Sequence, residues 1–428
     1  MSSCLPVTLT RTRTRTRTLT LTLHPAMPST KGVILVGGPS KGTRMRPLTL
    51  DCPKPLLPVA GKPMIWHPLQ ALSKVPDLTE VIIIGFYDDS QMAAFVKEAK
   101  REFPNIAISY LREYKALGTA GGLYHFRDSI LRPPVPQHIF ICNIDICCSF
   151  PFAEMLELHT SHGGTGTIMG VNVKKETATQ YGCIVTDPET NQMVHYVEKP
   201  EGWISNIVNG GVYLFDKSLF DVIKVAMDEK TARAAEDPLV KPDEILRLEQ
   251  DVIVPLAAAR KMYVYQTHDF WRQIKTAASA VTATALYLSN YKLTNPSLLA
   301  PAAPNIIAPT FIDPSATIDP SAKIGPNVAI GPNVTVGPGV RIKDAIVLEG
   351  STLEKHSCAL NSIVGTNSHI GAWSRVDGEQ EFEREVKGKI SVTILASEVS
   401  LAPETMVRSC IVLPNKTLTK NATNQVLL

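Results

Sequence analysis

The sequence predicts an α/β protein of two folded domains, the first with a mixed, mostly parallel sheet and the second a parallel β-helix of hexapeptide repeats. Three observations predict it. The chain has 428 residues, enough for two or three domains. Short apolar runs alternate with helical stretches between residues 31 and 291, which is typical of a parallel sheet covered on both faces. From Ile312 onward, aliphatic residues recur at every sixth position.

Composition excludes two broad functional classes. The chain has 43 Lys and Arg against 40 Asp and Glu, and four of those arginines (Arg11, Arg13, Arg15, Arg17) lie in the first 26 residues. The remainder therefore has 39 basic against 40 acidic residues, which gives no support to a nucleic-acid-binding face. No apolar run approaches the roughly 20 residues needed to cross a bilayer, so a membrane protein is not expected.

Residues 1–30 are expected to be a disordered tail or a mis-annotated extension. Residues 1–26 lack acidic groups, and Thr alternates with Arg and then Leu from Leu9 to Leu23, a low-complexity pattern that cannot build a core. A mitochondrial transit peptide has similar composition, but a period of two does not make an amphipathic helix. A true start at Met27, just before the first predicted strand, is the favoured interpretation.

The apolar runs of the first domain (31–291) place its elements. Strands are predicted at Val33–Val36, Val81–Ile84, Ile106–Leu111, Ile139–Ile144, Thr167–Val173, Tyr196–Glu198, Val212–Phe215 and Met262–Tyr265, with helices such as Pro63–Val75 and Gln91–Phe103 between them. Ligands of such sheets bind at the carboxyl ends of the strands. Candidate functional residues are therefore those that directly follow each apolar run.

The second domain is predicted over 312–428, after a Pro- and Ala-rich connector at 292–311. Its repeating aliphatic residues are Ile312, Ile318, Ile324, Ile330, Val336, Ile342 and Leu348. A six-residue period fits a prism-like β-helix in which each hexad makes one flat side and its aliphatic residue points inward. The highly charged segment Asp377 to Lys389 breaks the period and is predicted to be an inserted loop.

Eight cysteines at irregular spacing include no C-x-x-C pair that would suggest zinc. Buried thiols in a reducing cytosol are the expected interpretation, which places the protein in the cytoplasm. The adjacent Cys147 and Cys148 are expected to serve packing rather than redox chemistry.

A glycine-rich segment, residues 37–65 (GGPSKGTRMRPLTLDCPKPLLPVAGKPMI), follows the first strand directly. Its glycines allow backbone N–H groups to approach an anion closely, and Lys41, Arg44, Arg46 and Lys54 supply positive charge where phosphates are expected. The order of residues differs from both the Walker loop and the G-x-G-x-x-G dinucleotide fingerprint.

This segment resembles the signature of sugar-phosphate nucleotidyltransferases, G-G-x-G-T-R-x-R-P-L-T followed by P-K-P-L. Further family elements follow in order: Glu113 with 117–121 (LGTAG), 143–145 (NID), Tyr181-Gly182, 197–200 (VEKP) and 209–211 (NGG). The resemblance covers residues 31–428 and is greatest to the mannose-1-phosphate guanylyltransferase family, in particular to its alpha, regulatory-type members. It implies a Rossmann-like nucleotidyltransferase domain followed by a left-handed β-helix.

The resemblance also implies site residues. Those implied to bind GDP-mannose are Gly37, Gly38, Glu113, Gly118, Thr119, Asn143, Asp145, Gly182, Glu198, Lys199, Asn209 and Gln273, and the positions equivalent to catalytic ones are Arg44, Lys54 and Asp145. Glu113 follows a strand and could accept two hydrogen bonds from a guanine edge. Asp145 could hold Mg²⁺ against phosphate oxygens, or be a buried structural carboxylate. Gly118 and its neighbours would open a helix whose N-terminus favours an anion, and Glu198 with Lys199 could instead form an ordinary surface ion pair.

Two departures from the family pattern argue against catalysis. Residues Pro39, Ser40 and Lys41 make the glycine-rich loop two residues longer than in active members, which weakens the exact positioning that phosphoryl chemistry needs. In place of the family's Trp-x-Asp metal motif, this chain has Trp271-Arg272-Gln273. A neutral Gln cannot replace the charge of a carboxylate on Mg²⁺, although it can still bind a diphosphate or a sugar, and Arg272 could add charge.

Three functions remain open at this point. The favoured one is a regulatory subunit that binds GDP-mannose and mediates feedback inhibition of a catalytic, beta-type partner, in homo- and hetero-oligomers. The charged insertion would then reach the partner's active site. The second is an active enzyme that makes GDP-mannose from GTP and mannose-1-phosphate. The third is an acyltransferase that uses the β-helix, for which His356 and His369 are the candidates.

Overall fold

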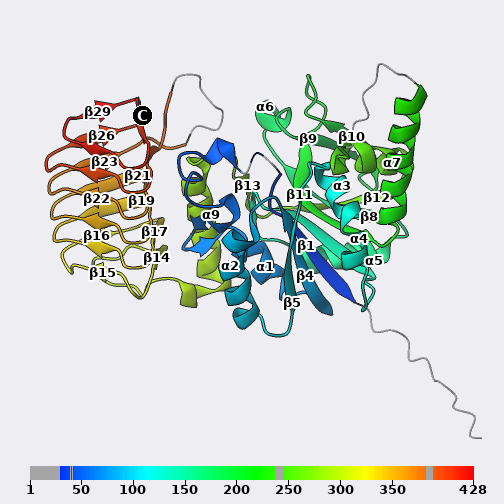
Figure 1. The fold of residues 1–428 in the computed structure, drawn as a ribbon, viewed down its shortest axis with the longest axis horizontal. Coiled ribbons are helices and arrows are strands. Elements are labelled where there is room, and N and C mark those ends of the chain that lie inside the picture. Colours follow the sequence, from blue (N-terminus) through cyan, green and yellow to red (C-terminus); the bar gives the residue numbers. More distant parts are fainter. Residues whose placement is uncertain (1–28, 39, 41, 237–244, 382–388) are drawn as a thin grey trace, which may run out of the picture.

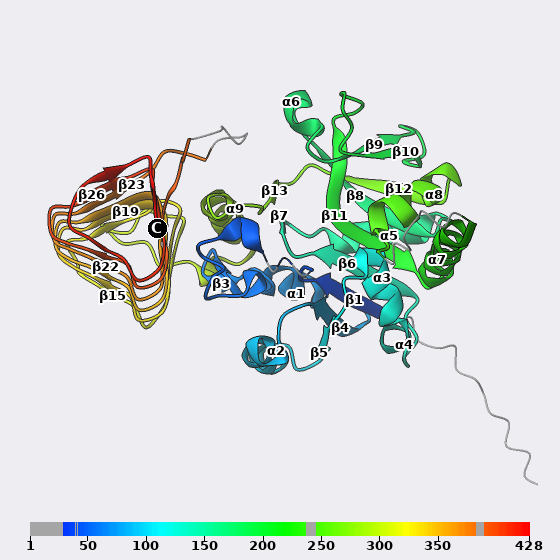
Figure 2. The same cartoon turned by 45° about the horizontal axis from the view of Figure 1, so that its top comes forward.

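The structure is a computed structural model that describes residues 29–38, 40, 42–236, 245–381 and 389–428. An α/β domain and a β-helix lie side by side, with helix α9 (Ser279–Thr294) between them (Figures 1 and 2). Within those ranges, no helix combines the length and the apolar character needed to cross a membrane. The predicted tail of residues 1–30 lies outside this description except for Ser29 and Thr30, which are buried at the start of the first strand.

One half of the main sheet is parallel and the other half is built around antiparallel pairs. Its parallel strands lie in the order β6 (His138–Asn143), β1 (Thr30–Leu35), β4 (Leu78–Gly85) and β5 (Ala107–Arg112). Strand β11 (Ile207–Asp216) is antiparallel to β6, to β8 (Gly166–Asn172) and to β9 (Gly182–Thr186). Strand β10 (Met193–Glu198) pairs with β9, and β12 (Met262–Thr267) pairs in parallel with β8. All eight predicted strands therefore have counterparts in this mixed sheet.

Helices cover both faces of the sheet because neighbouring residues of each strand point to opposite sides. Ile34 packs into a cluster with α1 (Trp66–Leu72), α2 (Asp89–Glu102), α5 (Phe152–Ser161) and α9, whereas Val33 packs with α3 (Gly118–His125), α4 (Arg127–Ile130), α7 (Leu219–Glu236) and α8 (Val254–Ala258). A capping box fixes the start of α2: Asp88 caps the first turn, and the backbone N–H of Asp88 donates to Gln91 at 3.2 Å.

Shorter elements connect these. They are η1 (Thr43–Met45), η2 (Lys54–Leu56), β2 (Pro58–Val59), β3 (Lys62–Pro63), β7 (Ile146–Cys148), α6 (Lys175–Ala178), the π-helix η3 (Leu248–Ile253), β13 (Trp271–Gln273) and η4 (Pro296–Leu298). Strands β7 and β13 form an antiparallel pair that sets Gln273 opposite Ile146.

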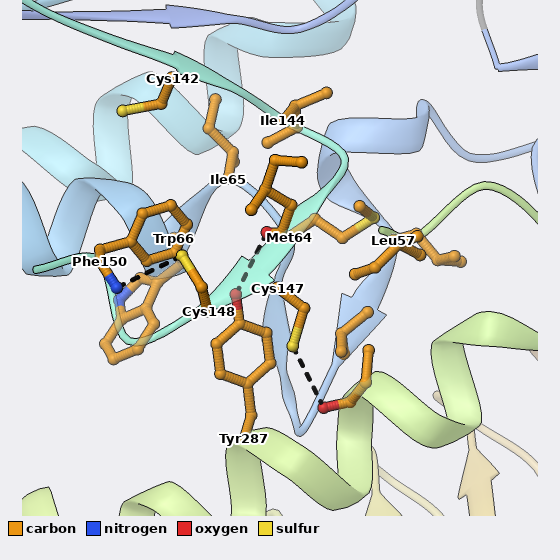
Figure 3. Close-up of a cluster of buried hydrophobic side chains, with 14 of the residues drawn as sticks. Leu57, Met64, Ile65, Trp66, Cys142, Ile144, Cys147, Cys148, Phe150 and Tyr287 are labelled. Atoms are coloured by element: carbon orange, nitrogen blue, oxygen red, sulfur yellow. Dashed lines mark hydrogen bonds between the residues drawn. The ribbon is translucent and has the colours of Figure 1, made fainter. Parts of the chain in front are cut away.

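The cysteines of β7 pack inside the first domain, as Figure 3 shows. Both Cys147 and Cys148 are buried; Cys147 Sγ lies 3.7 Å from the carbonyl oxygen of Ala283, and Cys148 Sγ accepts from the backbone N–H of Phe150 at 3.4 Å. The ring of Tyr287 lies beside them. All seven cysteines that the structure describes are free, and burial raises the pKa of the Cys148 thiol to about 12. This arrangement agrees with a packing role.

The β-helix consists of short parallel strands stacked coil on coil. They are β14 (Thr310–Ile312), β15 (Thr317–Ile318), β16 (Lys323–Ile324), β17 (Val328–Ile330), β18 (Thr335–Val336), β19 (Arg341–Val347), β20 (Thr352–Leu353), β21 (Cys358–Val364), β22 (His369–Ile370), β23 (Arg375–Asp377), β24 (Thr393–Leu395), β25 (Ser400–Leu401), β26 (Met406–Arg408), β27 (Ile411–Val412), β28 (Thr417–Leu418), β29 (Ala422–Thr423) and β30 (Val426–Leu427).

The six-residue repeat has the predicted meaning along the middle of its length. Ile324, Ile330 and Ile342 have no exposed surface and belong to the interior of the β-helix. Ile312 and Ile318 are only partly buried, and no earlier coil stacks on theirs. The prediction was wrong for Leu348, which packs instead in the cluster shared with the first domain.

The inserted segment is visible in the strand register. Thr352 pairs with His369, 17 residues further on, but His369 pairs with Ser400, 31 residues further on. The coil between them is therefore lengthened by the charged segment 377–389, of which residues 382–388 lie outside the described ranges.

One apolar cluster contains buried residues of both domains. Phe311 of β14 and Ile346 and Leu348 of β19 and the turn after it belong to the same buried cluster as Leu288 and Tyr291 of α9. Helix α9 and strand β14 extend into the segment 292–311 that the sequence assigned to a connector, and η4 lies between them. This packing holds the first coils of the β-helix against the α/β domain.

Candidate functional site

A cavity of about 510 Å³ lies where the parallel strands of the α/β domain end. Its wall includes the last residues of β1 and β6 and the residues just after β4 and β5, which is the edge where the sequence placed the site. Ten predicted residues line it: Gly37, Gly38, Arg44, Lys54, Glu113, Gly118, Thr119, Asn143, Asp145 and Gln273. We call it the nucleotide cavity.

The glycine-rich loop forms one wall of the nucleotide cavity. Gly37 and Gly42 have φ angles of 107° and 77°, in the region that favours glycine. A Cβ on Gly42 would lie 2.9 Å from Cβ of Lys54, so this glycine lets Lys54 approach the loop. Pro39 and Lys41, two of the three residues between Gly38 and Gly42, lie outside the described residues.

Asp145, which follows β6, lines the nucleotide cavity together with Lys54 and Lys275. Its Oδ2 is 3.8 Å from Nζ of Lys54, and both side chains are mostly buried. Burial lowers the pKa of Lys54, and the Asp145 carboxylate opposes that shift. Burial also lowers the pKa of Lys275, and Asp145 opposes this shift as well. The ammonium groups of Lys54 and Lys275 therefore both interact electrostatically with this carboxylate and add positive charge to the cavity.

These residues fit a divalent metal poorly. Mg²⁺ prefers several oxygen ligands and usually at least one or two carboxylates. Here Asp145 already faces Lys54, and Gln273 supplies a neutral amide whose Oε1 is buried and accepts no hydrogen bond within the described part of the chain. In the same described part, no three His, Cys, Asp or Glu side chains come together in a way that could hold a metal.

Glu113 is the second carboxylate of the nucleotide cavity, and it follows β5 as expected. Its backbone N–H donates to Gly85 at 2.8 Å, which ties it to the end of β4. A Cβ on Gly122 would lie 2.2 Å from Oε1 of Glu113, so the glycine makes room for the carboxylate. Burial raises the pKa of Glu113 to about 7. Hydrogen bonds donated by a ligand would stabilise the ionised form of this buried carboxylate.

The start of α3 differs from the expectation. The backbone N–H groups of Ala120 and Gly121 donate to the carbonyl of Leu246 at 3.0 and 3.4 Å, so these two donors are not available to an anion. The hydroxyl of Thr119 accepts from the backbone N–H of Leu248 at 2.8 Å. The φ of 77° at Gly118 lets the chain pass close to Leu246. Gly118 and Thr119 line the cavity, but part of this helix end serves the fold.

Four predicted residues, Gly182, Glu198, Lys199 and Asn209, do not line the nucleotide cavity. Asn209 donates to the hydroxyls of Tyr196 and Tyr213 at 3.1 and 3.0 Å and accepts from the backbone N–H of Gly211 at 2.8 Å. Both of its amide N–H donors and one acceptor position of its oxygen are therefore used within the fold. Tyr196 in turn donates to Glu198 at 2.7 Å, and Glu198 pairs with Lys199 at 3.4 Å. This polar cluster lies on β9, β10 and β11.

Two basic residues lie elsewhere than expected. Arg46 does not line the nucleotide cavity but lines a second cavity between the two domains. Arg272 forms an ion pair with Glu381 at 2.6 Å instead of facing the phosphate region. Conversely, sequence reasoning missed Lys275, which lines the nucleotide cavity. Its signal was available, because residues two apart on an extended chain point to the same side and Lys275 follows Gln273 at that spacing.

Family models match both domains. One described as "Nucleotidyl transferase" matches residues 31–287, and one described as "GMPPB C-terminal domain" matches residues 306–427. Among solved structures, "a Putative Glucose-1-Phosphate Thymidylyltransferase from Bacillus anthracis" is 21% identical, with a TM-score of 0.50 over 60% of this chain and 95% of its own. That likeness concerns the fold alone.

Curated relatives match nearly the whole chain. The mannose-1-phosphate guanylyltransferase regulatory subunits alpha of Xenopus tropicalis and Dictyostelium discoideum are each 46% identical, over 93% and 94% of this chain and 100% and 99% of their own. The regulatory subunit alpha-B of Danio rerio is 43% identical over 93% of this chain and its own full length. Together with the fold and the nucleotidyltransferase match, these identities show that the chain belongs to the family of mannose-1-phosphate guanylyltransferase alpha subunits.

Proposed function

We propose that this protein is a regulatory subunit that binds GDP-mannose and mediates feedback inhibition of a homologous catalytic, beta-type subunit in GDP-mannose synthesis. The observation that carries the proposal is the pair Asp145 and Gln273 in the nucleotide cavity. The cavity carries acidic and basic groups suited to a nucleotide sugar. At the position where the family pattern has the second carboxylate for a catalytic metal, this chain has the amide of Gln273.

The nucleotide cavity supports binding of a nucleotide sugar in one orientation. Glu113 is the group suited to the guanine edge, because the two oxygens of a carboxylate can accept hydrogen bonds from the two adjacent N–H donors of guanine. Arg44, Lys54 and Lys275 are suited to the diphosphate, since charge-assisted hydrogen bonds to phosphate are strong. Gln273 can accept a hydrogen bond from a sugar hydroxyl with its unpartnered Oε1. In this proposal the GDP-mannose-binding set also includes four residues on or next to strands β9, β10 and β11, namely Gly182, Glu198, Lys199 and Asn209. Of these, Asn209 is a positioning residue.

Binding without Mg²⁺ is part of the proposal. Lys54 and Lys275 supply positive charge that does not depend on a metal. The Asp145 carboxylate lies 3.8 Å from Nζ of Lys54 and opposes the lowering of the pKa of both lysines by burial. Catalysis of attack on the α-phosphate needs stronger charge stabilisation in the transition state than in the ground state. Losing a metal carboxylate therefore reduces turnover far more than it reduces product binding.

The test compares binding and turnover in the purified chain. Calorimetry with GDP-mannose, with and without Mg²⁺, should give the same dissociation constant, and GTP with mannose-1-phosphate should release little or no pyrophosphate. Robust pyrophosphate release that Asp145→Ala removes would instead identify an active guanylyltransferase. Lys323→Gln, an exposed change on the β-helix, is the matched control for handling effects.

The role of the insertion stays a prediction, since residues 382–388 lie outside the described ranges. Deleting Gln380 to Lys387 should leave GDP-mannose binding and assembly with the partner intact while relieving feedback inhibition of the partner. Because this deletion also removes Glu381, Glu381→Gln is the control that separates loss of the ion pair with Arg272 from loss of the remaining segment. Undiminished inhibition in the deleted complex would move the coupling to the domain interface. The cytosol is the proposed location, supported by the free thiols.

A further inference from the structure

A second cavity, of about 380 Å³, lies between the α/β domain and the β-helix, and we call it the interdomain cavity. Five basic side chains line it, against one acidic side chain among the described residues. The basic ones are Arg44, Arg46, Arg272, Lys275 and Lys389, and the acidic one is Glu381. The first four belong to the α/β domain, and Lys389 is the last residue of the inserted segment 377–389.

Positive charge gathered around a recess raises the electrostatic potential there and attracts anions. Between described residues, Arg46 and Lys389 form no ion pair. Lys275 lies over the ring of Tyr181 with its Nζ 4.8 Å from the ring centre, and its pKa is lowered by burial. Helix α9 starts at this cavity with Ser279, but the backbone N–H groups of Ser279, Ala280 and Val281 already donate to carbonyl groups of the preceding turn at 3.2, 3.1 and 3.1 Å.

The one acidic side chain shows how an anion fits here. The Glu381 carboxylate lies 2.6 Å from Arg272, accepts from the hydroxyl of Thr282 at 2.8 Å, and keeps only 12% of its side-chain surface exposed. A carboxylate of the chain itself therefore occupies one anion position in the wall. Of the remaining four cations, Lys275 interacts with the Asp145 carboxylate of the nucleotide cavity, whereas Arg44, Arg46 and Lys389 form no ion pair with another described residue.

We propose that the interdomain cavity binds a small phosphorylated ligand, with one or two phosphate groups and at most a single sugar. Its volume is at the low end for ligand pockets and smaller than that of the nucleotide cavity, so a whole nucleotide sugar is not the occupant. Phosphate oxygens match the guanidinium forks of Arg46 and Arg272 and the ammonium of Lys389. The ligand competes with Glu381 for Arg272.

Binding here affects the nucleotide cavity, because Arg44, Gln273 and Lys275 line both cavities. An anion in the interdomain cavity neutralises part of the charge that the proposed GDP-mannose site uses. The two ligands therefore weaken each other's binding, and by linkage the factor is the same in both directions. The interdomain site itself stands even if the nucleotide cavity takes a different nucleotide sugar.

The experiment titrates the full chain with pyrophosphate, inorganic phosphate and mannose-1-phosphate by calorimetry at low salt. Pyrophosphate should bind the Glu113→Ala variant as well as wild type, which separates this site from the nucleobase end of the nucleotide cavity. The double variant Arg46→Gln/Lys389→Gln should bind it at least roughly tenfold more weakly, because two charged contacts are lost. Glu381→Gln should bind it several-fold more tightly, since the internal competitor loses its charge.

Matched controls are Arg101→Gln and Lys323→Gln, which remove exposed basic side chains outside the cavity. Both Arg46 and Lys389 are exposed, so their replacement should leave the melting temperature unchanged. Tighter binding of mannose-1-phosphate than of pyrophosphate identifies a sugar phosphate as the ligand, and the reverse identifies a bare diphosphate. Equal pyrophosphate affinity in wild type and in the double variant overturns the proposal.

Discussion

If Glu113 contacts guanine as proposed, GDP-mannose binding should depend on pH in a range where the ligand's own charge does not change. Burial raises the pKa of Glu113 to about 7 in the free protein. The proposed contact to guanine needs the ionised carboxylate, because the protonated group loses acceptor capacity. Affinity should therefore fall as the pH is lowered through 7.

The size of the effect follows from this pKa. With a pKa of about 7, roughly nine tenths of Glu113 is ionised at pH 8 and roughly one tenth at pH 6. If only the ionised form binds, affinity drops about tenfold between these pH values, or about 1.4 kcal/mol. Replacing Glu113 altogether should cost about 2 kcal/mol or more, since it leaves buried guanine donors unpaired.

Calorimetry at pH 6, 7 and 8 in wild type and in Glu113→Gln checks this reasoning. The variant should bind weakly and with a flat pH profile, because its amide does not titrate. A constant wild-type dissociation constant from pH 6 to pH 8 would refute the assignment of Glu113. The same slope in both proteins would assign the pH dependence to another group.

Stability responds to Glu113 in the opposite sense. Its pKa in the folded protein is above the ordinary value of 4.5, so the folded state binds more protons than the unfolded state between pH 4.5 and 7. Stability is lost as the pH rises through this window. Glu113→Gln should therefore melt higher than wild type at pH 8 and equally at pH 4, which gives a check that needs no ligand.

Three further changes test other parts of the structure. Gln273→Asp restores a second carboxylate near Asp145, so GDP-mannose affinity should become sensitive to Mg²⁺ and EDTA in calorimetry; indifference to Mg²⁺ would show that the wall cannot assemble a metal site. Gly42→Ala places a Cβ 2.9 Å from Lys54 at a φ of 77°, so urea unfolding should show that the free energy of unfolding falls by about 1–2 kcal/mol. The control is Gly202→Ala, which should change the free energy of unfolding little because no described atom lies within 4 Å of the added Cβ. Burial lowers the pKa of His67 to about 3, so the imidazole stays neutral in the folded protein and the free energy of unfolding should fall as the pH drops below 6.5. In His67→Phe, the slope of the free energy of unfolding against pH should decrease by the equivalent of about one proton. An unchanged slope would contradict the assignment.

Periodic and local features could be predicted from the sequence. Alternating apolar runs predicted the eight strands because a buried strand shows its hydrophobic pattern within a few residues. The hexad predicted the β-helix interior because each coil repeats the same local requirement, as Ile324 and Ile330 show. The glycine-rich segment predicted one wall of the nucleotide cavity, since Gly42 and Lys54, which approach each other closely, both belong to the continuous segment 37–65.

Only the tertiary structure decided which side chains share a cavity. Arg44 and Arg46 are two residues apart, yet Arg46 lines only the interdomain cavity. Arg272 pairs with Glu381 because the β-helix packs against α9, a contact that no local pattern encodes. Asn209 has the right chemistry for a sugar hydroxyl, but its amide N–H groups donate to Tyr196 of β10 and to Tyr213 of its own strand. The sequence by itself determined the elements and their chemistry, whereas the partners of each polar side chain depend on distant segments that meet only when the chain packs.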